Sequence, residues 1–411
     1  MKYLKPTTNP LFQALIVSVL CLMAAIFAGS RAFSIGLLVS IWFLLSLKYS
    51  DQKKLVFLIG LFLLSVFLII AYNLKNDSSL GRILIYKISF NILKDHYITG
   101  IGYGKFKMLY MHYQAQYFAS AHYTTKELLL ADNIIYAYND YFQLIIELGI
   151  IGITLLISYI YFIIITFKKI YREGSSRNLL FLFSLMIYIS VTVAAIFNFE
   201  YSRPVVQALF MLSISVVTWF VYLQQYKKVI IFYFAGCFAL MVTFISFSYN
   251  EILHYKAYQE FTEAKELSSA GFKTEALNKC SEIYPQLKND YQYLLYYGPA
   301  LLRGDDPEKA LSVLITADKL VSCNSLYTDI GECYYLTRNF KKAEISYILA
   351  INMVPNRFES RYKLYNFYKN TRQNQKALQV GQAILKLPVK INSPYAAFIR
   401  NNVSRDLKTL Q

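Results

Sequence analysis

The chain has 411 residues, of which 56% are hydrophobic, and 42 lysine and arginine residues face only 25 aspartate and glutamate residues. This content is too apolar for an ordinary soluble protein, although the last third of the chain is polar. The net charge of +17 would suit nucleic acid, but many of the basic residues stand beside apolar segments, where they set the orientation of a membrane protein. We therefore discount a nucleic-acid partner.

Apolar segments with little or no charge recur along the chain up to residue 249. Each is long enough to cross roughly 30 Å of hydrocarbon as a helix that satisfies its own backbone hydrogen bonds. They lie at Leu11–Ala28, Ala32–Leu47, Leu55–Tyr72, Leu148–Phe167, Leu179–Asn198, Val205–Leu223 and Val229–Ser248. The sequence predicts a multi-pass membrane domain of about seven spans over residues 1–249, in contact with membrane lipids.

Basic residues mark one side of this domain. They stand before the first predicted span and after the second, fourth and sixth, at Lys2, Lys5, Lys48, Lys53, Lys54, Lys168, Lys169, Arg172, Arg177, Lys227 and Lys228. That side is predicted to be cytoplasmic. The opposite side, the periplasm if the membrane is a bacterial inner membrane, then holds the short connection Gly29–Arg31, a loop at 73–147, the turn Phe199–Pro204 and residues 250–411.

Ser30 and Arg31 lie between the first two predicted spans with almost no loop around them. An arginine at this depth is costly unless it meets an anion or reaches the interface. Arg31 is therefore a candidate anion-binding residue, and the alternative is an arginine that extends to lipid phosphates.

The loop at 73–147 is too long to be a mere turn, and we expect it to carry the function. The alternative is a loop that only covers the membrane domain. After Asn76–Ser79, helical spacing of apolar residues predicts an amphipathic helix near the membrane surface, with Gly81 and Arg82 at its first turn. A glycine-rich turn follows, in which Gly100, Gly102 and Gly104 would let the backbone pass close to a ligand or a neighbouring helix.

No metal or cofactor is expected from this sequence. His96, His112 and His122 of the loop are spaced unlike any metal-ligand motif, and we expect most of them to lie at the surface. The glycine spacing is not that of a nucleotide-binding loop. The cysteines form no CxxC pair, although Cys280 and its neighbours in the tail would be able to form a disulfide in an oxidising compartment.

The loop closes on a polar segment that leads into the fourth predicted span. Asn139 and Gln143 are four residues apart, and Asp140 and Glu147 are seven apart. On one continuous helix these two pairs would project from roughly the same face.

Taken together, these motifs resemble the superfamily of O-antigen ligases and Wzy-type polymerases, which are bacterial inner-membrane glycosyltransferases. The resemblance covers about Leu11 to Leu223 and rests on Ser30-Arg31, Gly81-Arg82, the turn Gly100–Gly104, Asn139–Gln143 and Glu147–Gly152. It implies a donor glycan linked to a polyprenyl diphosphate, typically undecaprenyl, and a glycan or lipid A core acceptor. It also implies catalytic roles for Arg31, Arg82, Tyr138 and Asn139, and substrate contacts for Ser30, Gly81, Gly102, Gly104, Asp140 and Gln143.

The chain departs from this family in two ways. Relatives typically have ten to twelve spans, so the chain looks like the C-terminal portion of a longer protein or a shortened open reading frame. Ligases typically carry His-Asn in the closing segment, where this chain has Tyr138-Asn139. A tyrosine with an ordinary pKa near ~10 is a poor base at neutral pH, so the general base stays open.

The tail at 250–411 is polar and carries a repeat. Ala276, Ala310, Ala343 and Ala377 recur in similar contexts at intervals of 34, 33 and 34 residues, which is the period of tetratricopeptide repeats. Pro355 and Pro388 are expected to follow the ends of second helices. The sequence thus predicts an α-solenoid that docks a protein partner; the alternative is a capping domain without one.

The sequence is compatible with two main functions and a third, weaker one. In the first, Arg31 and Arg82 hold the diphosphate of the donor, because a guanidinium matches phosphate oxygens and keeps its charge, while an acceptor hydroxyl attacks the anomeric carbon with inversion. In the second, the protein is a membrane-anchored repeat scaffold of a periplasmic envelope complex without catalysis. A transporter is a weaker third reading.

Overall fold

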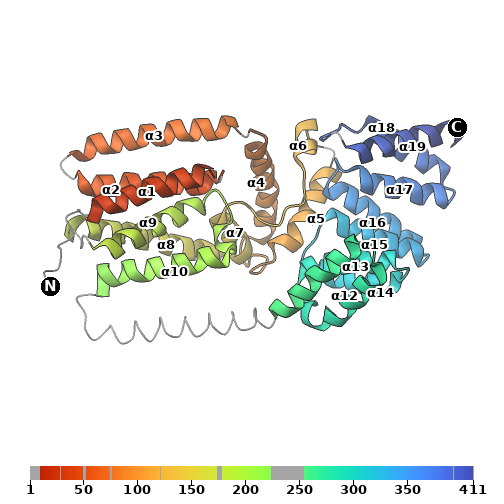
Figure 1. The fold of residues 1–411 in the computed structure, drawn as a ribbon. Coiled ribbons are helices and arrows are strands. Elements are labelled where there is room, and N and C mark those ends of the chain that lie inside the picture. The colour runs from red at the N-terminus through yellow and green to blue at the C-terminus, as the bar shows by residue number, and fades with distance from the viewer. Residues whose placement is uncertain are drawn as a thin grey trace. The chain divides into compact units, whose positions relative to one another are not determined.

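A computed structural model describes residues 10–27, 29–49, 52–74, 76–120, 122–173, 178–223, 254–391 and 393–410. Within these ranges the chain forms helices and no strand, which confirms the predicted all-helical class (Figure 1). The chain divides into two compact units. We call them the membrane unit (described residues of 10–82, 96–101 and 136–223) and the array unit (83–95, 102–135 and 254–410).

Apolar helices build the membrane unit. They are α1 (Pro10–Phe27), α2 (Arg31–Lys48), α3 (Lys53–Leu74), α7 (Asp140–Leu148), α8 (Ile150–Glu173), α9 (Leu179–Ala194) and α10 (Pro204–Thr218), which continues as a π-turn to Leu223. Among the described residues, three segments are long and apolar enough to cross a membrane, and three apolar helices are shorter. The first six predicted spans thus fall on apolar helices. Val229–Ser248 and the predicted domain boundary at 249 and 250 lie outside the described residues.

Two predicted spans have different ends in the structure. The fourth begins at Ile150 rather than Leu148, because Gly149 adopts φ 59° and ψ −132° and separates α8 from α7. The polar closing segment and the span are therefore not one continuous helix. The fifth ends at Ala194 rather than Asn198, and the next carbonyl, that of Ala195, accepts a hydrogen bond from the Asp140 amide at 2.9 Å.

Helix α9 forms the centre of the membrane unit. Its side chains are buried along its length, and α1, α2 and α10 contact it. Gly36 of α2 lies so close to α9 that a Cβ atom there would be 2.2 Å from the Ser190 carbonyl oxygen. A residue without a side chain permits this approach of two helix backbones. The contact fixes α2, and with it Arg31, against the core.

The array unit contains consecutive, mutually contacting helices in its C-terminal part. A helix at 254–269 is followed by α12 (Lys273–Leu287), α13 (Tyr291–Arg303), α14 (Pro307–Asp318), α15 (Asn324–Leu336), α16 (Phe340–Met353), α17 (Phe358–Asn370), α18 (Asn374–Lys386) and α19 (Pro394–Leu410). The four regularly spaced alanines lie on α12, α14, α16 and α18, and each is at most 4% exposed. Helices α16 and α18 end before Pro355 and Pro388, as predicted.

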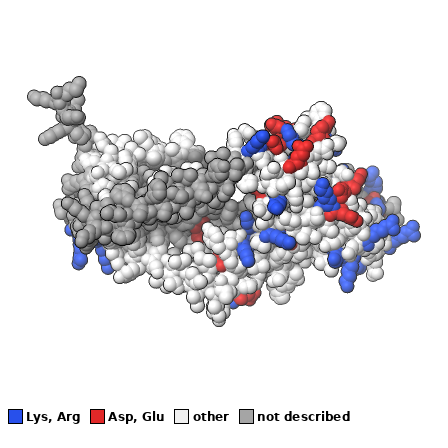
Figure 2. Space-filling view, turned by 90° about the horizontal axis from the view of Figure 1, so that it is seen from below, with Lys and Arg blue, Asp and Glu red and all other residues white. Residues whose placement is uncertain are grey.

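Small and large residues meet where these helices pack. A Cβ atom on Gly298 would lie 2.4 Å from the Leu314 side chain, and one on Gly331 would lie 2.8 Å from the Tyr347 ring. In the next pair the sizes are exchanged, since Gly381 faces Tyr365. On the face in Figure 2, charged side chains gather over the array unit, and the described surface of the membrane unit is mostly uncharged.

Most of the long loop also belongs to the array unit. It forms α4 (Asn76–His96, of which 83–95 lie in this unit), α5 (Phe106–Ala119) and α6 (Thr125–Leu130). Glu127 of α6 accepts hydrogen bonds from Lys87 of α4 at 2.8 Å and from Tyr117 of α5 at 2.9 Å, which ties the three helices together. Arg82 lies in the second turn of α4 rather than the first, because the helix begins at Asn76.

The cysteines and histidines differ in part from expectation. Cys280, Cys323 and Cys333 are buried and free, so the disulfide that the sequence allowed is not formed. His112 is partly buried. Its ring lies beside Ser322 and Tyr327 of the array unit, and burial lowers its pKa.

Candidate functional site

The two candidate arginines of the membrane unit both reach the start of α4. Arg31 is the first residue of α2, after Ser30 in the N-cap position, and its Nη2 donates to the Ser78 hydroxyl at 3.3 Å. Ser78 precedes Arg82 by four residues, which is about one helical turn. The structure thus brings Arg31 to the turn of α4 that precedes Arg82.

Arg82 lies between a carbonyl and an aromatic ring. Its Nη1 donates to the Phe197 carbonyl oxygen at 2.6 Å, and its Cζ lies 5.4 Å from the centre of the Tyr138 ring. This distance is within the range of a cation–π interaction. Gly81 beside it has open space where a Cβ atom would be, so packing does not require a glycine there.

Tyr138 belongs to an aromatic cluster that we define as Tyr136, Tyr138 and Phe199. The Phe199 ring stacks on Tyr136 with centroids 4.4 Å apart and meets the edge of Tyr138 at 5.4 Å. Tyr138 has φ 54°, a left-handed conformation that costs about 1–3 kcal/mol in a residue with a side chain. The surrounding contacts hold a strained residue against Arg82.

Asn139 and Gln143 shape the backbone around Tyr138. Asn139 caps α7, because its Oδ1 accepts from the Phe142 amide at 3.0 Å. Gln143 accepts from the Ala137 amide at 3.1 Å and donates to the buried Glu147 carboxylate at 3.0 Å. These contacts give both residues a structural role that the sequence did not predict, and their roles in catalysis and substrate binding stay predictions.

Asp140 joins α7 to the turn between α9 and α10. Its Oδ2 accepts from the Tyr201 amide at 3.0 Å. Burial raises the pKa of Asp140 from its ordinary value of 3.8 to about 6, although the backbone amides of Tyr201 and Glu200 lower it in part. A carboxyl group with a pKa near 6 is able to exchange a proton close to neutral pH.

The turn between α9 and α10 supplies an arginine that the sequence analysis did not select. The Arg203 guanidinium lies 5.3 Å from the Phe199 ring centre and 3.7 Å from the carboxylate of Glu200, which is 1% exposed. Arg203 and Arg82 thus both contact the aromatic cluster. One signal was available: like Arg31, Arg203 directly precedes a predicted span on the side opposite the basic connections.

The glycines of the turn after α4 differ in how closely other atoms approach them. Gly100 makes the close backbone approach, since a Cβ atom there would lie 2.2 Å from the Glu147 carbonyl oxygen. Gly102 faces only the flexible Lys105 side chain, and Gly104 has nothing within 4 Å. The predicted close approach to a neighbouring helix is therefore found at Gly100, and a substrate role for Gly102 and Gly104 stays a prediction.

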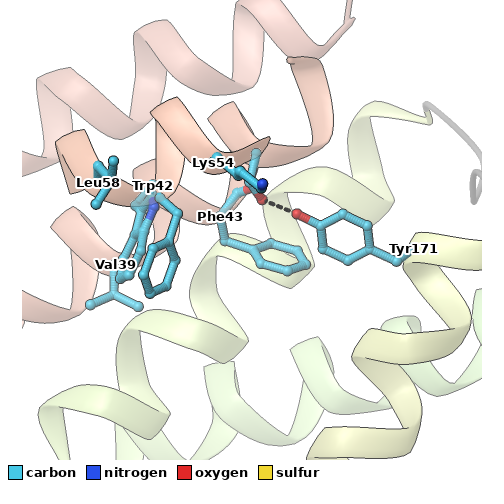
Figure 3. Close-up of a pocket in the computed structure, with 8 residues that line it drawn as sticks. Val39, Trp42, Phe43, Lys54, Leu58 and Tyr171 are labelled. Atoms are coloured by element: carbon cyan, nitrogen blue, oxygen red, sulfur yellow. Dashed lines mark hydrogen bonds between the residues drawn. The ribbon is translucent and has the colours of Figure 1, made fainter. Parts of the chain in front are cut away.

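An apolar cavity of about 690 Å³ lies elsewhere in the membrane unit (Figure 3). It is lined by Val39, Trp42, Phe43, Ser46, Lys54, Phe57, Leu58 and Tyr171, and the Tyr171 hydroxyl donates to Ser46 at 2.6 Å. Ser46 is fifteen residues from Arg31 along α2, which corresponds to about 22 Å of helix. The cavity is therefore not part of the arginine site. Among the described residues, no group of three His, Cys, Asp or Glu side chains is arranged to hold a metal ion.

Comparison with known proteins identifies a matching family. Residues 16–157 match the family model described as O-antigen ligase. A search of curated proteins finds no match. The matched range contains Arg31, Arg82 and the aromatic residues Tyr136 and Tyr138, and it ends before Arg203. The match supports the superfamily indicated by the sequence motifs and, at this coarse level, a membrane-bound ligase or polymerase that handles lipid-linked glycans.

Proposed function

We propose that this protein is a glycosyltransferase of a bacterial inner membrane that transfers a glycan from a polyprenyl diphosphate to an acceptor in cell-surface polysaccharide assembly. The observation that carries the proposal is Arg82 beside Tyr138, with Arg31 bonded one turn earlier on α4. Guanidinium groups suit a diphosphate because they offer several N–H donors and stay charged at all relevant pH values.

In this proposal the arginines act on the leaving group. As the bond between the anomeric carbon and the diphosphate oxygen breaks, negative charge grows on the diphosphate, and Arg31, Arg82 and Arg203 stabilise it. The acceptor hydroxyl attacks from the opposite face and loses its proton, which gives inversion. Asp140, whose pKa of about 6 suits a proton acceptor near neutral pH, is the candidate base in place of the histidine that ligases typically carry at the position of Tyr138.

We further propose that the C-terminal helices form a tetratricopeptide array and that the loop and the array face the periplasm. The buried alanines on alternate helices and the glycine contacts at Gly298 and Gly331 support the repeat assignment. The rival function is a membrane-anchored scaffold, in which the arginines would have no common ligand.

Glycan transfer in cells that make a lipid-linked glycan tests the proposal. We expect Arg82→Lys to reduce transfer by at least about tenfold, because lysine does not reproduce two parallel N–H contacts to phosphate. Arg31→Ala should reduce it as well, whereas Tyr138→Phe keeps the ring beside Arg82 and should change it little. Arg172→Lys, an exposed exchange at the far end of α8, is the matched control. Unchanged transfer in both arginine variants would refute the diphosphate site and favour the scaffold.

A further inference from the structure

The loop contacts one particular edge of the helical array. This edge consists of the described residues of three connections: 319–323 between α14 and α15, 354–357 between α16 and α17, and 387–391 with 393 between α18 and α19. The Ser322 amide donates to the Lys107 carbonyl oxygen at 3.1 Å. Asn133 and Asn324 exchange two hydrogen bonds, of 2.9 and 3.0 Å. All these residues belong to the array unit.

Asn356 makes the densest of these contacts. It is 6% exposed, and its Nδ2 lies 2.8, 3.2 and 2.7 Å from the carbonyl oxygens of Leu128, Leu129 and Ala131. These carbonyls stand at the C-terminal end of α6, where a helix leaves its last acceptors without partners. Helix α6 has only six residues and is too short to be stable alone. Asn356 therefore supplies hydrogen-bond donors to the carbonyl groups at the C-terminal end of α6.

Gln114 repeats this arrangement from the side of the loop. It lies on α5, is 1% exposed, and its Nε2 donates to the carbonyl oxygens of Met353 at 2.5 Å and Asp132 at 3.0 Å. Because both hydrogens of this buried amide donate to carbonyl oxygens, Gln114 fixes α5 against the segments that carry Met353 and Asp132. The exposed ion pairs of Asp132 with Arg357 and Lys390 add little to this.

We propose that this edge is a docking surface for the chain's own loop, and that Asn356 is a positioning residue for glycan transfer. The inference rests on the proposed function. Asn133 is held by Asn324, and Tyr136 of the aromatic cluster follows three residues later, a span of at most about 10 Å. The docked loop therefore holds the start of the segment that leads along the chain to Tyr136 and Tyr138.

Hydrogen exchange on the full-length protein tests the docking directly. Asn356→Asp keeps the shape of the side chain but replaces the donor by a carboxylate that faces three carbonyl oxygens. We expect the amides of 128–139 to exchange at least about tenfold faster, while α16 and α17 keep their protection. Asn370→Asp, an exposed exchange within the same array, should change neither. Unchanged exchange at 134–139 in Asn356→Asp would overturn the inference.

Transfer by a cross-linked variant separates positioning from folding. Asn356→Asp should lower kcat by about 10- to 100-fold, as misplacement of catalytic groups does, with KM for the donor little changed. A short bismaleimide between Asp132→Cys and Arg357→Cys, which join the same segments, should restore kcat in the Asn356→Asp background. Variants that carry only one of the two introduced cysteines should not regain kcat on treatment with the cross-linker. Failure of the cross-link to restore transfer would mean that Asn356 supports folding only.

These measurements distinguish the inference from the function on which it rests. A wild-type protein that transfers no glycan, but whose loop amides lose protection in Asn356→Asp, refutes the proposed reaction and keeps the docking surface. A wild-type protein that transfers glycan as fast as its Asn356→Asp variant keeps the reaction and refutes the positioning role.

Discussion

Replacement of Gly100 by alanine perturbs the contact that separates α7 from α8. Gly100 has φ 66°, and an added Cβ atom would lie 2.2 Å from the Glu147 carbonyl oxygen and 2.6 Å from the Gly149 amide nitrogen. Both are backbone atoms, so no side chain is able to rotate away. Gly104, in the same turn, has a similar φ of 73° and nothing within 4 Å of its Cβ position. The two glycines therefore differ in contact and hardly in conformation.

The difference between the two variants isolates the cost of the contact. A left-handed alanine costs about 1–2 kcal/mol at either position, and overpacking at Gly100 adds about 1–3 kcal/mol. The loss of unfolded-state freedom on changing glycine to alanine is common to both and cancels. We expect Gly100→Ala to lower the free energy of unfolding by about 1–3 kcal/mol more than Gly104→Ala does.

Titration of the full-length protein with sodium dodecyl sulphate in mixed micelles, followed by far-ultraviolet circular dichroism, measures both variants. A larger loss in Gly100→Ala, accompanied by faster hydrogen exchange of the Ile101 and Ile150 amides that cross this junction, would support the contact. Equal losses in the two variants would refute it and leave backbone strain as the whole effect.

Three further predictions follow from single residues. Asp140→Asn should raise the free energy of unfolding at pH 7.5 and leave it nearly unchanged at pH 4. The pKa of Asp140 is about 6 in the folded protein and ordinarily 3.8. The wild-type free energy of unfolding therefore falls as the pH rises through this interval. Lower stability of Asp140→Asn at pH 7.5 would contradict this. Ala343→Trp should destabilise α15 and α16 by about 1–3 kcal/mol in hydrogen exchange, because Ala343 is fully buried, while the exposed Lys341→Trp should not. Cysteines at Ser120 and Ser312 should react alike with a membrane-impermeant reagent in intact cells, and opposite labelling would contradict their common unit.

The sequence predicted features that depend on local composition. Membrane helices follow from runs of apolar residues, and the regular alanines follow from a repeated helix contact, so both were visible without coordinates. The break between α7 and α8 at Gly149 was not predicted from the sequence, because it depends on contact with the backbone of Gly100, nearly fifty residues earlier. A glycine in an apolar run carries no local sign that another backbone crosses it.

The contacts between the loop and the array were not predicted from the sequence for the same reason. Gln114 and Met353 are 239 residues apart, and an amide that satisfies distant carbonyls leaves no periodic pattern in the sequence. The candidate site was partly predictable. Arg82 and Tyr138 were selected from motifs and lie together, whereas Phe199 and Arg203 come from a turn that the motifs did not cover.

The shared unit of loop and array also constrains the topology of the chain. Segments that pack into one another lie on the same side of a membrane, so an even number of crossings must separate the loop from the array. Among the described residues, three apolar helices follow the loop: α8, α9 and α10. The parity is met with the further span that the sequence predicts at Val229–Ser248. The same count predicts Arg31 and Arg203 on the side of the loop, because each stands before a predicted span on that side, and Arg82 lies within the loop itself. In the proposed reaction, a donor whose diphosphate lies at that surface would reach all three arginines without crossing the membrane.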